Sequence, residues 1–100
     1  MKDIVSIEIM IKNMHENIKL VINPNTLTFN NDKKISKELI NELIRTICLW
    51  KNEYGFSSKI DVEEFKVIIK TTNKIDTFHG KGIYPSNYKY FKKIIGEIYG

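Results

Sequence analysis

The segment His79-Gly80-Lys81-Gly82 is the part of the chain whose residue types come closest to a chemical site. Glycines let backbone amides approach an anion and the lysine adds positive charge, so this corner could cradle a phosphate. A helix predicted from Ser86 would point its positive dipole end at the same corner. The spacing matches neither a P-loop nor a dinucleotide-binding motif, because Pro85 stands at the third glycine position. The alternative is that the glycines serve a turn or bulge at a strand end.

The histidines and the cysteine are too scattered to define a catalytic or metal site. His15 and His79 would form a ribonuclease-like acid–base pair only if the fold brought a hairpin turn and a strand end together. Two histidines and Cys48, tens of residues apart, match no zinc spacing. We expect Cys48 to be a small buried hydrophobe beside the apolar stripe of a helix. We therefore assign no catalytic residue, no metal and no cofactor.

An acidic cluster precedes one predicted strand, and it consists of Asp61, Glu63 and Glu64. A cation site or an acid pair is conceivable there. A solvated loop at the start of the strand is the interpretation we favour, because charged residues are mostly exposed.

Lysines and tyrosines lie close together on the last predicted helix. Tyr90 falls off the apolar stripe of that helix, beside Lys89, and would suit a protein-interface anchor or a base-stacking platform. The alternative is a ring lying half-buried on the surface. With the glycine corner added, the predicted binding surface is Lys81, Tyr84, Lys89, Tyr90, Lys92 and Lys93. Such a basic surface suits an acidic protein partner or a nucleic acid.

The composition weakens the case for nucleic acid. The chain has 100 residues, a formal net charge of +4 and an isoelectric point near 9.1. It contains no Ala and no Gln, uses Ile, Lys and Asn heavily, and has Arg45 as its only arginine. This pattern is expected of an AT-rich genome, such as that of a low-GC bacterium or its phage. Part of the lysine excess then follows codon usage, and arginine, whose planar fork suits phosphate, is nearly absent.

Size and residue usage predict one domain, residues 1–100, in a reducing compartment. A single cysteine excludes an intramolecular disulfide, so we expect a cytoplasmic protein. An acid stands early in the N-terminal segment, which argues against a signal peptide. No apolar run approaches the roughly 18 residues that a membrane span needs.

Apolar spacing predicts an α+β fold. Period-two alternation predicts strands over about 4–12, 18–22, 26–29, 62–71 and 75–80. Helical spacing predicts one helix over about 34–52, with either the turn Asn30-Asn31-Asp32 or Ser36 as its N-cap and Gly55 as terminator, and a second helix from Ser86. The order β-β-β-α-β-β-α predicts a mostly antiparallel sheet of about five strands with two helices on one face, a two-layer sandwich. The first or third strand is expected at an exposed edge, where a homodimer could pair.

The C-terminal half resembles a pattern in small uncharacterised bacterial proteins: a helix with a Trp, a strand hairpin, a Gly, and a Tyr-Pro-x-Asn-Tyr helix start. The residues that carry it are Leu49-Trp50, Tyr54, Asp61, Phe65–Ile69, Gly80, Tyr84–Tyr88 and Phe91. Where such proteins often have Asp-Gly before the strand, this chain has Asp61-Val62. The resemblance implies a fold and carries no assigned activity.

These observations favour a non-enzymatic protein that binds a macromolecule. The first expectation is a protein–protein interaction module of inhibitor or immunity type, with an acidic partner. The alternative is a nucleic-acid-binding protein that uses the same patch, and its binding should fall steeply with salt. A small hydrolase or nuclease acting through His79 is the third and least favoured hypothesis.

Overall fold

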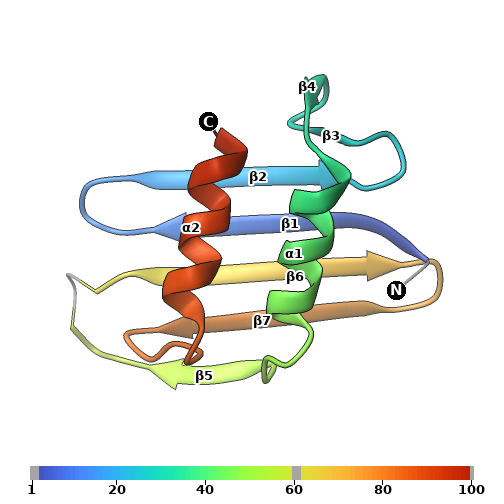
Figure 1. The fold of residues 1–100 in the computed structure, drawn as a ribbon. Coiled ribbons are helices and arrows are strands. Elements are labelled where there is room, and N and C mark those ends of the chain that lie inside the picture. The colour runs from blue at the N-terminus through green and yellow to red at the C-terminus, as the bar shows by residue number, and fades with distance from the viewer. Residues whose placement is uncertain (1–2, 60–61, 100) are drawn as a thin grey trace.

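The computed structural model describes residues 3–59 and 62–99, so Asp61 of the acidic cluster lies outside the described residues. The strands in these ranges are β1 (Ile4–Lys12), β2 (Asn17–Asn23), β3 (Thr28–Phe29), β4 (Lys33–Lys34), β5 (Glu53–Phe56), β6 (Glu64–Thr71) and β7 (Ile75–Lys81). The helices are α1 (Lys37–Ile47) and α2 (Tyr88–Tyr99). Figure 1 shows α1 and α2 side by side across one face of the sheet.

The described residues form one seven-stranded sheet in the order β4-β3-β2-β1-β6-β7-β5. Neighbouring strands are antiparallel except β5 and β7, which are parallel. The α+β class and the two helices on one face are therefore confirmed, whereas the prediction of about five strands is wrong. The missed strands are β4 and β5, and they form the two edges. The expectation that the first or third strand lies at the edge is wrong as well, because β1 is central and β4 covers β3.

The missed strand β5 follows from where α1 ends. Trp50 and Tyr54 continue the apolar spacing of the helix, which is why the sequence predicts a helix to about residue 52. The helix instead ends at Ile47, and the N–H of Trp50 donates to the C=O of Ile47 at 2.9 Å. Gly55 does not terminate the helix, since it lies inside β5 with φ +106°. The chain thus turns at the end of α1 and reaches the sheet edge within a few residues.

Side-chain hydrogen bonds fix both helix starts. Ser36 is the N-cap of α1, as one of the predicted alternatives had it, and its hydroxyl accepts from the N–H of Leu39 at 3.1 Å. Asn87, directly before α2, accepts from Trp50 Nε1 at 2.7 Å and donates to the C=O of Thr46 at 3.0 Å. The start of α2 is therefore tied to the end of α1.

The core lies between the sheet and the helices. Alternate residues of β1, Ile7, Ile9 and Ile11, are fully buried beneath them. The Trp50 ring centroid lies 4.8 Å from that of Phe91 and so anchors the β5 side of the core. Burying one large apolar side chain contributes about 1.5–3 kcal/mol, so this single layer is the main source of stability. In the described parts of the chain, neither α1 nor α2 is long and apolar enough to cross a membrane.

Candidate functional site

The structure divides the predicted lysine and tyrosine surface between two faces of the sheet. Lys81 alternates along β7 with the buried residues Phe78 and Gly80, so its side chain lies on the face without helices. Its Nζ is 5.1 Å from the centroid of the Phe56 ring on β5. Tyr84 is half-buried on the helix side of the sheet. The six predicted residues therefore do not form one contiguous patch.

On α2, two of the predicted residues are engaged by neighbouring acids. Lys92 Nζ lies 2.8 Å from Glu63 Oε1. The Tyr90 hydroxyl donates to Glu42 Oε2 on α1 at 2.7 Å, and this hydrogen bond raises the pKa of Tyr90. Lys89 and Lys93 are exposed on the same helix. The helix therefore retains a small exposed part of the predicted surface, with Tyr90 bridging to α1.

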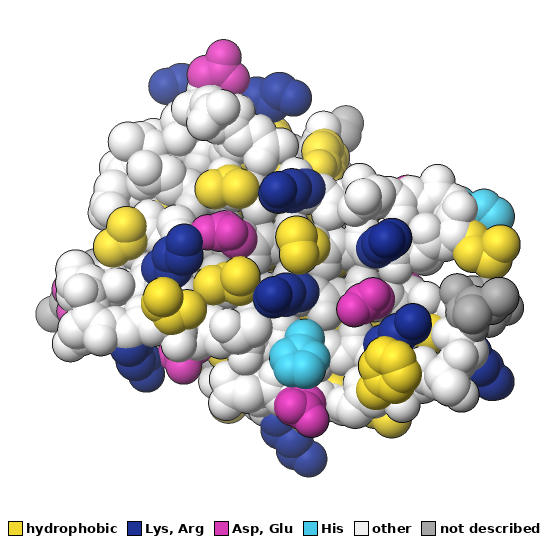
Figure 2. Space-filling view, turned by 180° about the vertical axis from the view of Figure 1, so that it is seen from behind, with side chains coloured by type: hydrophobic (Ala, Val, Ile, Leu, Met, Phe, Trp, Pro, Cys, Tyr) yellow, Lys and Arg dark blue, Asp and Glu magenta, His cyan; other side chains and the backbone are white. Residues whose placement is uncertain are grey.

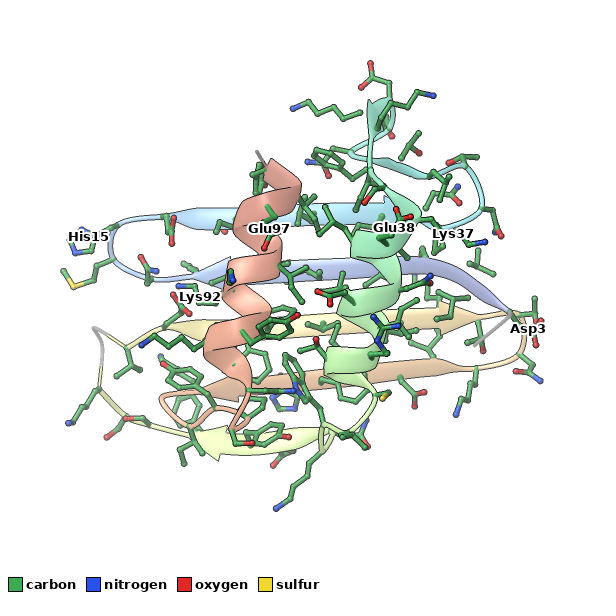
Figure 3. All side chains as sticks on the ribbon, viewed as in Figure 1. Asp3, His15, Lys37, Glu38, Lys92 and Glu97 are labelled. Atoms are coloured by element: carbon green, nitrogen blue, oxygen red, sulfur yellow. The ribbon has the colours of Figure 1, made fainter. Side chains whose placement is uncertain are left out.

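Glu63, which we expected in a solvated loop, is instead mostly buried at the centre of a polar cluster, so that expectation is wrong for this residue. Its carboxylate accepts from the Tyr88 hydroxyl at 2.5 Å and from Asn13 Nδ2 at 2.8 Å, besides its contact with Lys92. Its backbone C=O accepts from the Tyr84 hydroxyl at 2.8 Å. The cluster ties the β1–β2 turn, the start of β6 and α2 together. Figure 3 shows Lys92 on the side of α2 nearer to the turn that carries His15.

The titration of this cluster follows from its contacts. Partial burial alone would raise the pKa of the Glu63 carboxyl. Hydrogen bonds from Lys92, Tyr88 and Asn13, with the charge of Lys92, outweigh burial and hold that pKa below its ordinary value. Burial raises the pKa of Tyr88, and its hydrogen bond to Glu63 raises it further. The carboxylate is thus ionised and the phenol neutral near pH 7, which is the state that keeps the contacts.

The glycine corner is explained by close packing. A Cβ on Gly80 would lie 2.6 Å from the Ile83 carbonyl oxygen and 2.8 Å from Phe65 Cε1. Gly82 has φ +80°, and a Cβ there would lie 2.6 Å from that of Ser57. The N–H of Gly82 donates to the C=O of Glu63 at 3.3 Å, so it is not directed at an anion site. These contacts support the turn alternative over a phosphate cradle.

The two histidines and the cysteine stay apart. His15 lies in the β1–β2 turn, whereas His79 lies on β7, with Nε2 3.6 Å from Glu53 Oε2. Cys48 is exposed directly after α1, so the expectation that it is buried is wrong. Across residues 3–59 and 62–99, no three His, Cys, Asp or Glu side chains are grouped so that they could hold a metal ion.

The face of the sheet opposite the helices is uncovered, and Figure 2 shows hydrophobic, basic and acidic side chains interspersed over it. The strand register places Lys19, Met10, Lys66 and His79 side by side on β2, β1, β6 and β7. Neighbouring strands lie about 4.8 Å apart, so this row spans roughly 15 Å. A parallel row contains Val21, Glu8, Ile68 and Thr77. The uncovered face is therefore a broad, continuous surface.

Large apolar side chains are exposed on this face. They are Val5, Met10, Val21, Phe56 and Ile75, with exposed fractions between 38% and 74%. Met10 and Lys66 border a shallow hollow of about 240 Å³, and Val5 and Val21 border another of about 450 Å³. Such concavities can accept side chains of a partner.

The uncovered face is basic overall. On β1, β2, β5, β6 and β7, the residues of this face include five lysines, Lys12, Lys19, Lys66, Lys70 and Lys81, and three glutamates, Glu8, Glu53 and Glu64, which gives these five strands a net charge of +2. Lys70 Nζ pairs with Glu8 Oε2 at 2.9 Å. The remaining lysines are concentrated toward the end of the face that carries Lys12 and Lys81.

No family model matches the chain, and neither a curated protein nor a solved structure matches it. We therefore infer the function of the chain from the geometry of its surfaces. The polar side of the first strand, Ser6, Glu8, Met10 and Lys12, is visible in the alternation of the sequence. The order of the strands in the sheet is not visible in the sequence. Without that order, the row of Lys19, Met10, Lys66 and His79 across four strands cannot be assembled.

Proposed function

We propose that the chain is a non-enzymatic protein-binding domain of inhibitor or immunity type that engages an acidic partner through the uncovered face of its sheet. The observation that carries the proposal is the set of exposed apolar side chains that lie among lysines on one broad face. Phe56 and Ile75 are the most exposed of these side chains. Apolar patches on small soluble domains mark interaction sites, and a mixture of apolar and polar residues is typical of protein interfaces.

The charge of the face selects the partner. Lys12, Lys19 and Lys66 are exposed on three adjacent strands. A partner with carboxylates opposite them would gain in rate of association and in specificity. The face would repel a second copy of itself, which disfavours face-to-face self-association.

A protein partner fits this face better than a nucleic acid does. Glu8, Glu53 and Glu64 lie among the lysines, and each would repel a phosphate backbone. Phe56 is an aromatic ring at one edge, whereas single-stranded nucleic acids are held by several stacking rings. The row of Lys19, Met10, Lys66 and His79 is the observation that favours nucleic acid, and it keeps that function as the second candidate.

A non-enzymatic role is supported by the state of the Glu63 cluster. The carboxylate is saturated by Tyr88, Lys92 and Asn13, so it is not poised to exchange a proton with a substrate. A general base needs a pKa near the working pH, and that of Glu63 is shifted away from it.

Affinity capture from a lysate of the source organism, with and without nuclease, tests the nature of the partner. We expect a specific protein that stays bound after nuclease treatment and dissociates only gradually as salt is raised. Recovery of nuclease-sensitive RNA or DNA, released steeply by salt, would contradict the proposal and support the second candidate.

A further inference from the structure

The outer edge of β2 is half open. β3 pairs with β2 only at Ile22 and Asn23, so the first part of β2 extends beyond its neighbour. In an antiparallel strand, the backbone groups of alternate residues point to the same side. On the outer side of β2, the Val21 C=O accepts from the Asn30 N–H at 2.8 Å. The backbone N–H and C=O groups of Lys19 and Asn17 therefore also point to the outer side.

Side chains replace a neighbouring strand at part of this edge. Asn30 Oδ1 accepts from the N–H of Val21 at 3.0 Å, and the Tyr99 hydroxyl donates to the C=O of Lys19 at 3.1 Å. Within residues 3–59 and 62–99, no hydrogen bond reaches the N–H of Lys19. Asn17 lies still farther from β3. An unpaired donor on an exposed edge is a template for another strand.

A groove runs beside this edge on the helix side. It has a volume of about 550 Å³, its apolar part is formed by Ile18, Ile95, Gly96 and Tyr99, and Glu16, Asn17 and Lys92 line the rest. A Cβ on Gly96 would meet no atom within 4 Å, so this part of α2 leaves open space. Figure 1 shows α2 crossing the sheet to end beside β2. A strand added to β2 would therefore place alternate side chains in a groove that is mainly apolar and carries Glu16 and Lys92 at its border.

On the opposite side, the same added strand would meet positive charge. Lys19 is exposed there, beside Met10 and in one row with Lys66. Side chains of a strand alternate between the two faces. The partner that fits has apolar residues toward the groove and acidic residues toward Lys19. A second copy of this chain fits poorly, because strand pairing about Lys19 would set two lysines against each other.

We propose that the open edge of β2 binds an extended peptide segment in which acidic and apolar residues alternate, by strand addition. This edge adjoins the sheet face of the proposed function and shares Lys19 with it, whereas the backbone contact at the outer side of β2 belongs to the edge alone. The backbone of the peptide accepts from the N–H of Lys19, and its apolar side chains enter the groove. This is the mode by which sheet edges recognise extended segments.

Fluorescence anisotropy with a labelled peptide, Ser-Glu-Val-Glu-Leu-Glu-Val-Ser, tests the proposal. The control peptide has the same composition with the three glutamates adjacent. We expect the alternating peptide to bind at least about tenfold more tightly, because only it can present one face to the groove and the other to Lys19. Equal binding of the two peptides, or no binding of either, would overturn the proposal.

Lys19→Pro tests the backbone contact, because proline removes the outward N–H and does not disturb the ladder to β1. We expect it to weaken peptide binding about tenfold, as loss of one interface hydrogen bond does, whereas Lys19→Ala, which keeps the N–H, weakens it by less than about threefold. Tyr99→Phe removes one of two side-chain donors to the Lys19 C=O, the other being Asn30 Nδ2 at 3.4 Å, and should not weaken binding. Unchanged affinity in a folded Lys19→Pro variant would overturn the proposal.

Hydrogen exchange in the wild-type chain gives a readout that needs no variant. We expect the Lys19 amide to exchange quickly in the free protein and to become protected when the alternating peptide is added. An amide that stays unprotected at saturating peptide would overturn strand addition even if the peptide binds. Charge reversal at Lys12 and Lys66 tests the sheet face separately, so the two proposals can fail independently.

Discussion

The Glu63 carboxylate and the Tyr88 hydroxyl, 25 positions apart in the chain, are joined by a hydrogen bond of 2.5 Å. Glu63 precedes β6 and Tyr88 begins α2, so this contact fixes the helix against the end of the sheet. Lys92 and Asn13 donate to the same carboxylate, and each comes from a different part of this junction. The cluster therefore acts as a structural joint, and its loss should be felt in stability.

Glu63→Gln should lower the free energy of unfolding by about 1–3 kcal/mol, because the amide NH₂ would face one of three donors and leave it unsatisfied. Glu64→Gln is the matched control: the neighbouring side chain is exposed on the sheet face, and its change should stay within about 0.5 kcal/mol. Urea unfolding followed by Trp50 fluorescence measures both. Equal effects of the two substitutions would contradict a structural role for the cluster.

The lowered pKa of Glu63 predicts a pH dependence. A carboxyl whose pKa is lower in the folded chain contributes stability above its unfolded pKa, about 4.3 for Glu, and loses it as pH falls through the folded pKa. The stability difference between wild type and Glu63→Gln should therefore be constant near neutral pH and shrink in acid. Urea unfolding at a series of pH values checks this. A difference that grows on acidification would show that the pKa is raised.

Two glycines should respond to alanine in opposite directions. Gly80→Ala should destabilise by about 1–3 kcal/mol, because the new Cβ would overlap the Ile83 carbonyl oxygen. Gly96→Ala should stabilise by about 0.5–1 kcal/mol, because Gly96 lies within α2 with open space around it and alanine favours helix. Thermal unfolding of both variants measures the contrast. A tolerated Gly80→Ala would refute close packing at this corner.

Asn87→Ala should destabilise by about 1–3 kcal/mol, since it removes the acceptor of Trp50 Nε1 and the donor to the Thr46 C=O. Asn25→Ala, in an exposed turn, is the control and should be nearly neutral. Chemical denaturation measures both variants. The result that counts against this link is an Asn87→Ala variant as stable as wild type.

The parts of the fold that follow a strict period were predictable. Alternation of Ile7, Ile9 and Ile11 predicts β1 with the bounds that the structure has, Ile4–Lys12. β5 was not predictable, because its Tyr54 continues a helical spacing and its pairing with β7 joins segments far apart in the sequence. Local pattern carries no information about such contacts.

The candidate site was less predictable than the fold. Lys81 was predicted to share a surface with the lysines and tyrosines of α2, and this depended on which face of β7 its side chain occupies. The neighbouring glycines obscured the alternation along that strand. Lys92 was assigned from helical spacing, but its acidic partner Glu63 lies at the start of a distant strand. The uncovered face could be assembled only from the register of four strands.

The most direct test of the proposed function compares two variants with the same change of charge on opposite faces. The sheet-face variant carries Lys12→Glu and Lys66→Glu, and the helix-face variant carries Lys89→Glu and Lys93→Glu. Binding of the captured protein partner to each immobilised variant is measured by biolayer interferometry, after circular dichroism has confirmed that both are folded. We predict that the sheet-face variant loses at least about tenfold in affinity, as reversal of interface charges does, while the helix-face variant binds like wild type. Loss of binding in the helix-face variant, with the sheet-face variant unaffected, would contradict the proposal.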